Sequence, residues 1–260
     1  MTSQSPRPTA LVTNDDGINS AFLWTLVESL EEAFDVTVVA PDGERSWTGR
    51  GFTRHGTLNL TQSSRPNAFA LDGTPTDCVN IGIGHVMSNR PDVVLSGINL
   101  GFNMSLPLIS TSGTVAGALE GALWGIHGVA SSFHIPFDVF DSIKDNHGRM
   151  EGDLQTALVE SAKRTTEYAL ELCKGPPVGT VVHNLNFPST MSRETPVEDV
   201  ALSNLRLGSV YRRLNTTQFT FQFPSKRDAV FSSENTDFSA LKRGHASICK
   251  LHYDQLTPAK

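Results

Sequence analysis

The strongest constraint on the fold is an alternation of short apolar strands and amphipathic helices in the first half of the chain. Residues 9–13 (TALVT) predict a buried strand, and residues 20–33 carry apolar side chains at helical spacing. Residues 35–40 (DVTVVA) predict a second strand. A strand, a helix and a strand of these lengths form a βαβ unit, which requires a parallel sheet.

The alternation continues toward the middle of the chain. Residues 68–71 form a short apolar stretch, and further strands are predicted at 92–96 and 128–133, with helices opening at the GTPTD segment and spanning 112–125. This repeated order is typical of an open, doubly wound α/β sheet. We therefore predict a Rossmann-like, mostly parallel sheet.

The second half of the chain gives weaker signals. Residues 152–173 predict one long helix, and residues 180–183 predict a short strand. Residues 202–223 alternate in the way expected of a β-hairpin. The stretch 135–150 is polar and is expected to be a surface loop.

Composition restricts the compartment and the partners. The net charge is −6 and no Lys/Arg cluster stands out, which argues against a surface for duplex nucleic acid. No apolar run approaches the roughly 20 residues of a membrane span, and the polar N-terminal segment lacks a signal-peptide core. Three scattered cysteines indicate neither a disulfide framework nor a zinc site. We expect a cytoplasmic protein with no membrane contact.

Two adjacent carboxylates, Asp15 and Asp16, follow the first predicted strand, where ligands bind in doubly wound sheets. A dinucleotide-binding protein would present G-x-G-x-x-G at this turn. Neighbouring carboxylates repel, which raises the pKa of one of them unless a cation lies between them. An isolated pair would indicate only a solvated turn, but this position favours a metal site. A phosphate substrate is compatible with the pair only through a bridging cation.

Other oxygen donors follow later strands. Ser46 comes after the second strand, and Asn99 and Asn103 follow the strand at 92–96. Such all-oxygen sets suit Mg²⁺, Mn²⁺ or Ca²⁺ rather than zinc or copper. The SGT segment at 112–114 opens a predicted helix and offers backbone N–H groups and hydroxyls to an anion. Each feature alone is more often an ordinary turn or helix cap.

Taken in order, these segments resemble the SurE (survival protein E) family of metal-dependent nucleotidases. The resemblance runs from residue 9 to about residue 250 and is carried by TNDDG (13–17), VVAPDGERS (38–46), LDGTPTDCV (71–79), PDVVLSGIN (91–99), SGTVAGALEG (112–121) and HNLNFP (183–188).

The resemblance implies divalent-metal-dependent removal of phosphate from 5′- or 3′-nucleotides, with nucleoside monophosphates as substrates. It implies one divalent ion, for which we expect Mg²⁺ or Mn²⁺. The implied metal ligands are Asp15, Asp16, Ser46 and Asn99, with Asp15 and Asp16 also the catalytic pair. The implied phosphate-binding residues are Asn14, Asn103, Ser112, Gly113 and Thr114.

The resemblance also implies a two-part organisation of the α/β fold. We expect a Rossmann-like metal- and phosphate-binding core over residues 9–135. Residues 136–260 are expected to complete the sheet and to carry a small β-hairpin and helix extension that helps to form a homodimer or a tetramer.

The sequence departs from the family pattern next to the implied metal ligands. Trp47 follows Ser46 where small residues are usual, and the stretch 104–111 lacks the acidic and aromatic residues expected there. Two interpretations of Trp47 stay open: it stacks on the base of a nucleotide, or it packs against the core.

Alternatives to hydrolysis also stay open. A catalytically weakened SurE-like protein would bind metal and nucleotide without turnover. A phospho-receiver module also has an acid pair after its first strand, but it needs an Asp at the end of its third strand, and the comparable strand here ends in SGIN. For a hydrolase, attack by water and an aspartyl-phosphate route are both compatible with the sequence.

Overall fold

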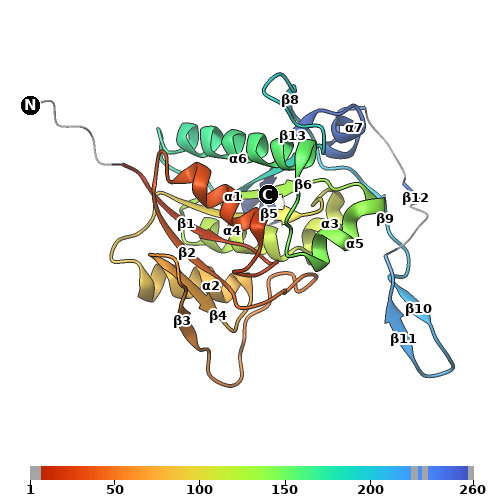
Figure 1. Ribbon diagram of the computed structural model, residues 1–260, viewed down its shortest axis with the longest axis horizontal. Coiled ribbons are helices and arrows are strands. Elements are labelled where there is room, and N and C mark those ends of the chain that lie inside the picture. Colours follow the sequence, from red (N-terminus) through yellow and green to blue (C-terminus); the bar gives the residue numbers. More distant parts are fainter. Residues whose placement is uncertain (1–6, 224–227, 230–233, 257–260) are drawn as a thin grey trace, which may run out of the picture.

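A nine-stranded sheet forms the centre of the computed structural model, which describes residues 7–223, 228–229 and 234–256. The strand order is β3-β4-β2-β1-β5-β6-β7-β13-β8, and Figure 1 shows the strands crossing the middle of the molecule. The central run of parallel strands consists of β4 (Ala68–Leu71), β2 (Asp35–Pro41), β1 (Thr9–Thr13), β5 (Val93–Leu100), β6 (His127–Phe133) and β7 (Val181–Phe187).

Strands from other parts of the chain extend both edges of this sheet. β3 (Leu60–Gln62) pairs antiparallel with β4, and β13 (Ala246–His252) pairs antiparallel with β7. β8 (Val197–Asp199) lies parallel to β13. The sheet therefore continues without a break past residue 135. A division of the chain at that residue stays a prediction.

The direction of winding reverses between β1 and β5. The chain proceeds from β1 through β2 to β4 on one side, and from β5 through β6 to β7 on the other. This arrangement confirms the predicted doubly wound α/β class. In such sheets the reversal opens a crevice at the carboxyl ends of the two central strands, which is where ligands bind.

Helices cover both faces of the sheet. On one face α1 (Ala21–Leu30) packs against α6 (Gly152–Leu172), and the two lie side by side in Figure 1. On the other face α2 (Pro75–Ile81) packs against α4 (Gly113–Leu123). A short π-helical turn, Gly82–Val86, extends α2.

Side-chain periodicity explains how these layers fit. In β1, Val12 belongs to the core under α1 while its neighbour Leu11 belongs to the core under α2, as strand alternation requires. The small residues of α4 allow a close approach to the sheet. A Cβ at Gly117 would lie 2.9 Å from Ser96 Oγ, and one at Gly121 would lie 2.5 Å from Val94 Cβ.

Two segments that the sequence analysis did not assign as helices are helical. The prediction of a surface loop over 135–150 is wrong, because α5 spans Phe137–Asp145. The departing stretch 104–111 forms α3 (Ser105–Thr111), with Pro107 in its first turn, where no intrahelical N–H bond is lost.

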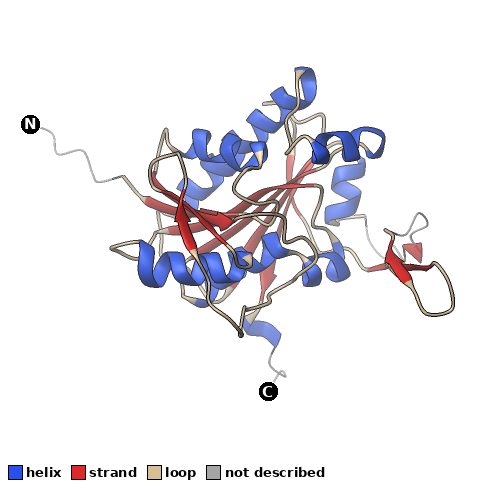
Figure 2. Ribbon diagram, turned by 60° about the horizontal axis from the view of Figure 1, so that its bottom comes forward, coloured by secondary structure: helices blue, strands red, loops and turns tan. Residues whose placement is uncertain are grey.

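The C-terminal part carries the predicted hairpin. β10 (Tyr211–Arg213) pairs antiparallel with β11 (Phe219–Phe221), and this hairpin projects from the body of the molecule in Figures 1 and 2. The remaining described elements are β9 (Leu205–Arg206), β12 (Asp228–Ala229), α7 (Asp237–Lys242) and a 3-10 turn (Asp254–Leu256). Within the described residues, no helix combines the length and apolar character needed to cross a bilayer.

Candidate metal and phosphate site

The NDDG turn after β1 is closed by Asn14. Its side-chain amide donates to the Gly17 carbonyl at 3.1 Å and accepts from the Gly17 N–H at 3.1 Å. Gly17 has a φ of 97°, a conformation that favours glycine. Asn14 is fully buried. It therefore holds the turn that carries Asp15 and Asp16 beyond the end of β1, and a phosphate contact from it stays a prediction.

Asp15 is packed against the first turn of α4. Its Oδ1 accepts a 2.7 Å hydrogen bond from the Thr114 hydroxyl, and the side chain is almost completely buried. A Cβ at Gly113 would lie 2.7 Å from the Asp15 Cβ, so only glycine fits without a shift. Ser112 caps the same helix, with its Oγ accepting from the Val115 N–H at 3.0 Å. The SGT segment therefore fixes Asp15 as well as opening α4.

Asp16 is half-buried and contacts the neighbouring central strand. Its Oδ2 accepts the Leu100 N–H at 3.0 Å. Burial, and then the negative charge of Asp15, raise the pKa of Asp16 to about 8. Burial likewise raises the pKa of Asp15. Two such carboxylates are destabilised as anions unless a cation shares them, so the pair fits a divalent metal.

The other implied metal ligands lie at the same pocket as Asp15. Ser46 and Asn99 both line this pocket, which has a volume of about 660 Å³. Asn99 stands in β5 just after a register shift against β6, and such irregularities re-aim side chains at sheet edges and functional sites. No cluster of three or more His, Cys, Asp or Glu side chains suited to a metal occurs in the described part of the chain. A cation here would depend on serine and asparagine oxygens in addition to the acid pair.

Asn103 also lines the pocket and is held by β7. Its backbone N–H donates to Asn186 Oδ1 at 2.8 Å, and its carbonyl accepts from Asn184 Nδ2 at 2.7 Å and Asn186 Nδ2 at 3.1 Å. Its own amide donates to the Ser132 hydroxyl at 3.0 Å. The two β7 asparagines were not among the predicted site residues. Their signal in the sequence is polar side chains at alternate positions of an otherwise apolar strand.

An ion pair at the pocket was also missed. Lys144 of α5 reaches Glu44, with Nζ 2.8 Å from Oε1. Burial opposes ionisation of Glu44, but hydrogen bonds from Lys144 and Ser46 outweigh it and hold the pKa of Glu44 below its usual value. Because α5 was expected to be a loop, no sequence pattern pointed to Lys144. Because Glu44 also hydrogen-bonds to Ser46, the ion pair orients the hydroxyl of this candidate metal ligand.

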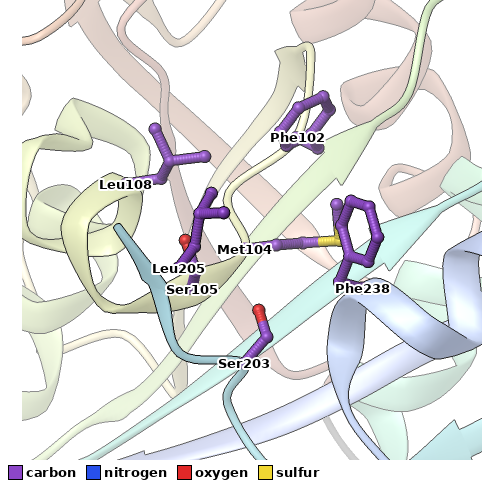
Figure 3. Close-up of a pocket in the computed structure, with 7 residues that line it drawn as sticks. All are labelled: Phe102, Met104, Ser105, Leu108, Ser203, Leu205 and Phe238. Carbon is purple, nitrogen blue, oxygen red and sulfur yellow. The ribbon is translucent and has the colours of Figure 1, made fainter. Parts of the chain in front are cut away.

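The C-terminal part supports α3, which borders the pocket. Asp237 is fully buried, and its Oδ2 accepts the N–H of Ser105, the first residue of α3, at 2.9 Å. Its Oδ1 accepts the Ser203 N–H at 2.9 Å. Figure 3 shows Met104 and Phe238 next to each other at a small pocket that Ser105 also lines. A carboxylate far along the sequence therefore anchors the stretch that departs from the family pattern.

The fold and the pocket define a doubly wound α/β protein with an acidic, oxygen-rich site at its switch point. The family model described as "Survival protein SurE" matches residues 10–210. The chain belongs to the SurE family, as the sequence motifs predicted. Membership of this family sets aside the phospho-receiver alternative.

Relatives cover nearly the whole chain. It is 36% identical over 247 residues to the 5′-nucleotidase SurE of Geobacter metallireducens, covering 94% of this chain and 91% of the relative. It is 32% identical over 263 residues to the 5′-nucleotidase SurE of Caldanaerobacter subterraneus subsp. tengcongensis, covering 95% and 92%. The solved SurE protein of Aquifex aeolicus superposes with a TM-score of 0.74 at 27% identity, covering 96% of this chain and 95% of that one.

Proposed function

We propose that this chain is a divalent-metal-dependent phosphoric monoester hydrolase that converts nucleoside monophosphates to nucleoside and phosphate, a 5′/3′-nucleotidase. The observation that carries the proposal is the acid pair, with Asp15 buried against the N-terminus of α4 and Asp16 held by β5, beside a pocket lined by Ser46, Asn99 and Asn103. The names of the relatives, 5′-nucleotidase SurE, support the substrate class.

Four side chains would hold the ion: Asp15, Asp16, Ser46 and Asn99. When bound, Mg²⁺ or Mn²⁺ supplies Lewis-acid polarisation of the phosphate. The side-chain oxygens of this set suit such hard ions. The Glu44–Lys144 pair orients the Ser46 hydroxyl for binding the ion.

The phosphate would lie at the first turn of α4. There the backbone N–H groups of Gly113 and Thr114, the Ser112 hydroxyl and the positive end of the helix dipole favour an anion. Asn103, held rigidly by the asparagines of β7, contributes a further polar contact. Donors fixed before the reaction stabilise the charge that develops in the transition state.

The acid pair would supply either the proton acceptor or the nucleophile of the reaction. In the direct route, one of the two carboxylates accepts the proton of the water that attacks phosphorus. In the covalent route, a carboxylate oxygen attacks phosphorus and the P–O bond to the nucleoside breaks, with the nucleoside oxygen taking a proton; water later cleaves the aspartyl-phosphate to phosphate and free carboxylate. Mass measurement of the intact enzyme after acid quenching during turnover distinguishes them, because only the covalent route adds a phosphoryl group to an aspartate.

The test is phosphate release from a panel of 5′- and 3′-nucleoside monophosphates with Mg²⁺, Mn²⁺ or EDTA. We expect release that depends on the metal and is abolished by EDTA. Metal-independent release would contradict the metal role. Nucleotide binding without release under any condition would favour the catalytically weakened alternative.

We also propose a homodimer or tetramer and a cytoplasmic location. Tyr211, Leu214 and Phe219 of the projecting hairpin are all more than half exposed, at 61%, 54% and 54%, which favours burial against another copy of the chain. The three cysteines are free thiols, as expected in a reducing compartment.

A further inference from the structure

Trp47 lies at the rim of the candidate site in an unusual backbone conformation. It directly follows Ser46, it is 38% exposed, and its φ is 64°. A positive φ is costly for a bulky residue and persists where the surrounding structure requires it, often at functional sites. Trp47 is not part of the buried core, so the interpretation that it packs against the core is wrong.

The rings in contact with Trp47 come from the projecting hairpin. The centroid of Phe221 lies 4.9 Å from that of Trp47, and the centroid of Phe223 lies 6.0 Å away. Both rings are tilted by 63° relative to Trp47, so neither is stacked face to face on it. Phe221 is 46% exposed. These contacts hold the three rings together while leaving ring surface open.

All three rings line the same pocket as the acid pair's Asp15. The polar lining residues Asp15, Asn103 and Ser112 are buried, whereas Trp47 and Phe221 are exposed. The pocket therefore combines buried polar groups with exposed aromatic rings. Its volume of about 660 Å³ lies within the range of about 300–1,000 Å³ typical of small-molecule sites.

We propose that Trp47, Phe221 and Phe223 form a nucleobase-binding site, in which the base of a nucleoside monophosphate stacks on aromatic rings while its phosphate lies at the acid pair. The proposal rests on the proposed function and deepens it. Aromatic stacking accepts any planar base, because every base has a π-face. The site therefore selects nucleotides over phosphate esters that have no base.

Substrates with and without a base test this selectivity. For adenosine 5′-monophosphate, we expect Trp47→Ala and Phe221→Ala each to raise KM by about 5- to 100-fold, the range measured for loss of one stacking contact. For ribose 5-phosphate, which has the same sugar and phosphate but no base, we expect KM to change less than about twofold because no stacking contact is lost. Trp47→Phe keeps an aromatic ring and should restore most of the affinity for the nucleotide.

Phe52→Ala is the matched control. Phe52 is an exposed aromatic residue of the same loop, 45% exposed, and lies outside the pocket lining. We expect it to leave both substrates unaffected. Equal losses for adenosine 5′-monophosphate and ribose 5-phosphate in Trp47→Ala would overturn the proposal, since they would indicate a disturbed Ser46 instead. Unchanged KM for both substrates would overturn it as well.

Tryptophan fluorescence tests the site without turnover. Adenosine 5′-monophosphate should quench the emission of the wild-type protein, and ribose 5-phosphate should not. The quench should disappear in Trp47→Phe, which retains Trp24 and Trp124, and persist in Phe52→Ala. A quench that survives in Trp47→Phe would contradict base stacking at this residue. If the wild type releases no phosphate from either substrate, the proposed function fails, and the quench still decides the nucleobase site.

Discussion

The close approach of Gly113 to Asp15 leaves no room for a side chain at residue 113. We predict that Gly113→Ala displaces Asp15, because the added Cβ would lie 2.7 Å from the Asp15 Cβ and 3.0 Å from Oδ2. The expected cost is about 1–3 kcal/mol of unfolding free energy. A displacement near 1 Å lowers kcat/KM by about 100-fold. Denaturant unfolding and phosphate-release kinetics measure the two effects.

Gly175→Ala is the control for this substitution. A Cβ at Gly175 would meet no heavy atom within 4 Å. Activity should therefore stay within about twofold of the wild type. Full activity of Gly113→Ala would show that the close approach of α4 does not position the acid.

The lowered pKa of His183 predicts that the free energy of unfolding depends on pH. Burial, and then the positive charge of Lys250, lower its pKa to about 4. Its Nδ1 lies 2.8 Å from the Tyr168 hydroxyl, which donates to the neutral ring. Because the folded pKa is below the unfolded value of about 6.5, the stabilisation is present above that pH and is lost as pH falls toward 4.

The test compares the wild type with His183→Gln by urea unfolding at neutral pH and at weakly acidic pH. We expect the wild type to lose about 1–2 kcal/mol more than the variant, a figure reduced because the ring is only partly buried. Equal losses in the two proteins would exclude His183 as the source.

At the residue scale, the rule that ligands bind beyond the carboxyl ends of parallel strands predicted which side chains lie close together. Asp15, Ser46, Asn99 and Asn103 lie at or beyond the carboxyl ends of β1, β2 and β5, and Ser112 opens α4, yet all line one pocket. They do so because parallel strands bring their carboxyl ends to one edge of the sheet. The rule does not extend to Lys144, which reaches the pocket from α5, or to Asn184 and Asn186, which hold Asn103 without lining the pocket themselves.

Among the elements, α3 depends most on a distant partner. We predict that Asp237→Ala lowers the unfolding free energy by about 2–4 kcal/mol, because buried N–H groups of Ser105 and Ser203 lose a charged acceptor. KM for nucleotides should also rise, since α3 borders the pocket. Chemical denaturation and steady-state kinetics check both effects.

Asp199→Ala is the matched control for Asp237→Ala. Asp199 is an exposed residue of β8 whose carboxylate lies 3.2 Å from Lys250 Nζ. Its loss should cost at most about 0.5 kcal/mol. Similar stability losses in the two variants would contradict the anchoring role of Asp237.

The helices α3 and α5 show where local sequence patterns are insufficient to predict a helix. In α5 the side chains of Val139, Phe140 and Ile143 do recur at helical spacing and pack on the core, but the helix has only nine residues. This is shorter than the window over which apolar periodicity predicts a helix. In α3 the stabilising carboxylate comes from Asp237, more than a hundred residues away. By contrast α1 and α6 carry long amphipathic patterns, and their predicted positions are confirmed.

At the scale of the whole molecule, the parallel centre of the sheet was predictable and its edges were not. Each βαβ unit restricts the placement of the next strand through its handedness. No such rule places β13 between β7 and β8, because this pairing joins segments far apart in the chain. Family resemblance covers these regions, but periodicity alone does not order them.

The projecting hairpin predicts the oligomeric state. We expect the wild-type protein to be a dimer or larger by light scattering after size exclusion, and Tyr211→Asp with Leu214→Asp to reduce its mass, because charges would replace exposed apolar side chains. The kcat/KM for ribose 5-phosphate should then be compared between the wild-type oligomer and the double variant of lower mass. A monomeric wild type, or a double variant of unchanged mass, would contradict an interface at the hairpin.

The most direct test of the central claim measures Mn²⁺ binding and phosphate release together, in the wild type, Asp15→Asn and Asp35→Asn. Asp35 begins β2, at the opposite end of this strand from the pocket, and its carboxylate is exposed, so it is the matched control. We predict that Asp15→Asn lowers both metal affinity and kcat by at least about 100-fold while Asp35→Asn changes neither. Wild-type levels of metal binding and phosphate release in Asp15→Asn would contradict the assignment of the acid pair as the metal site.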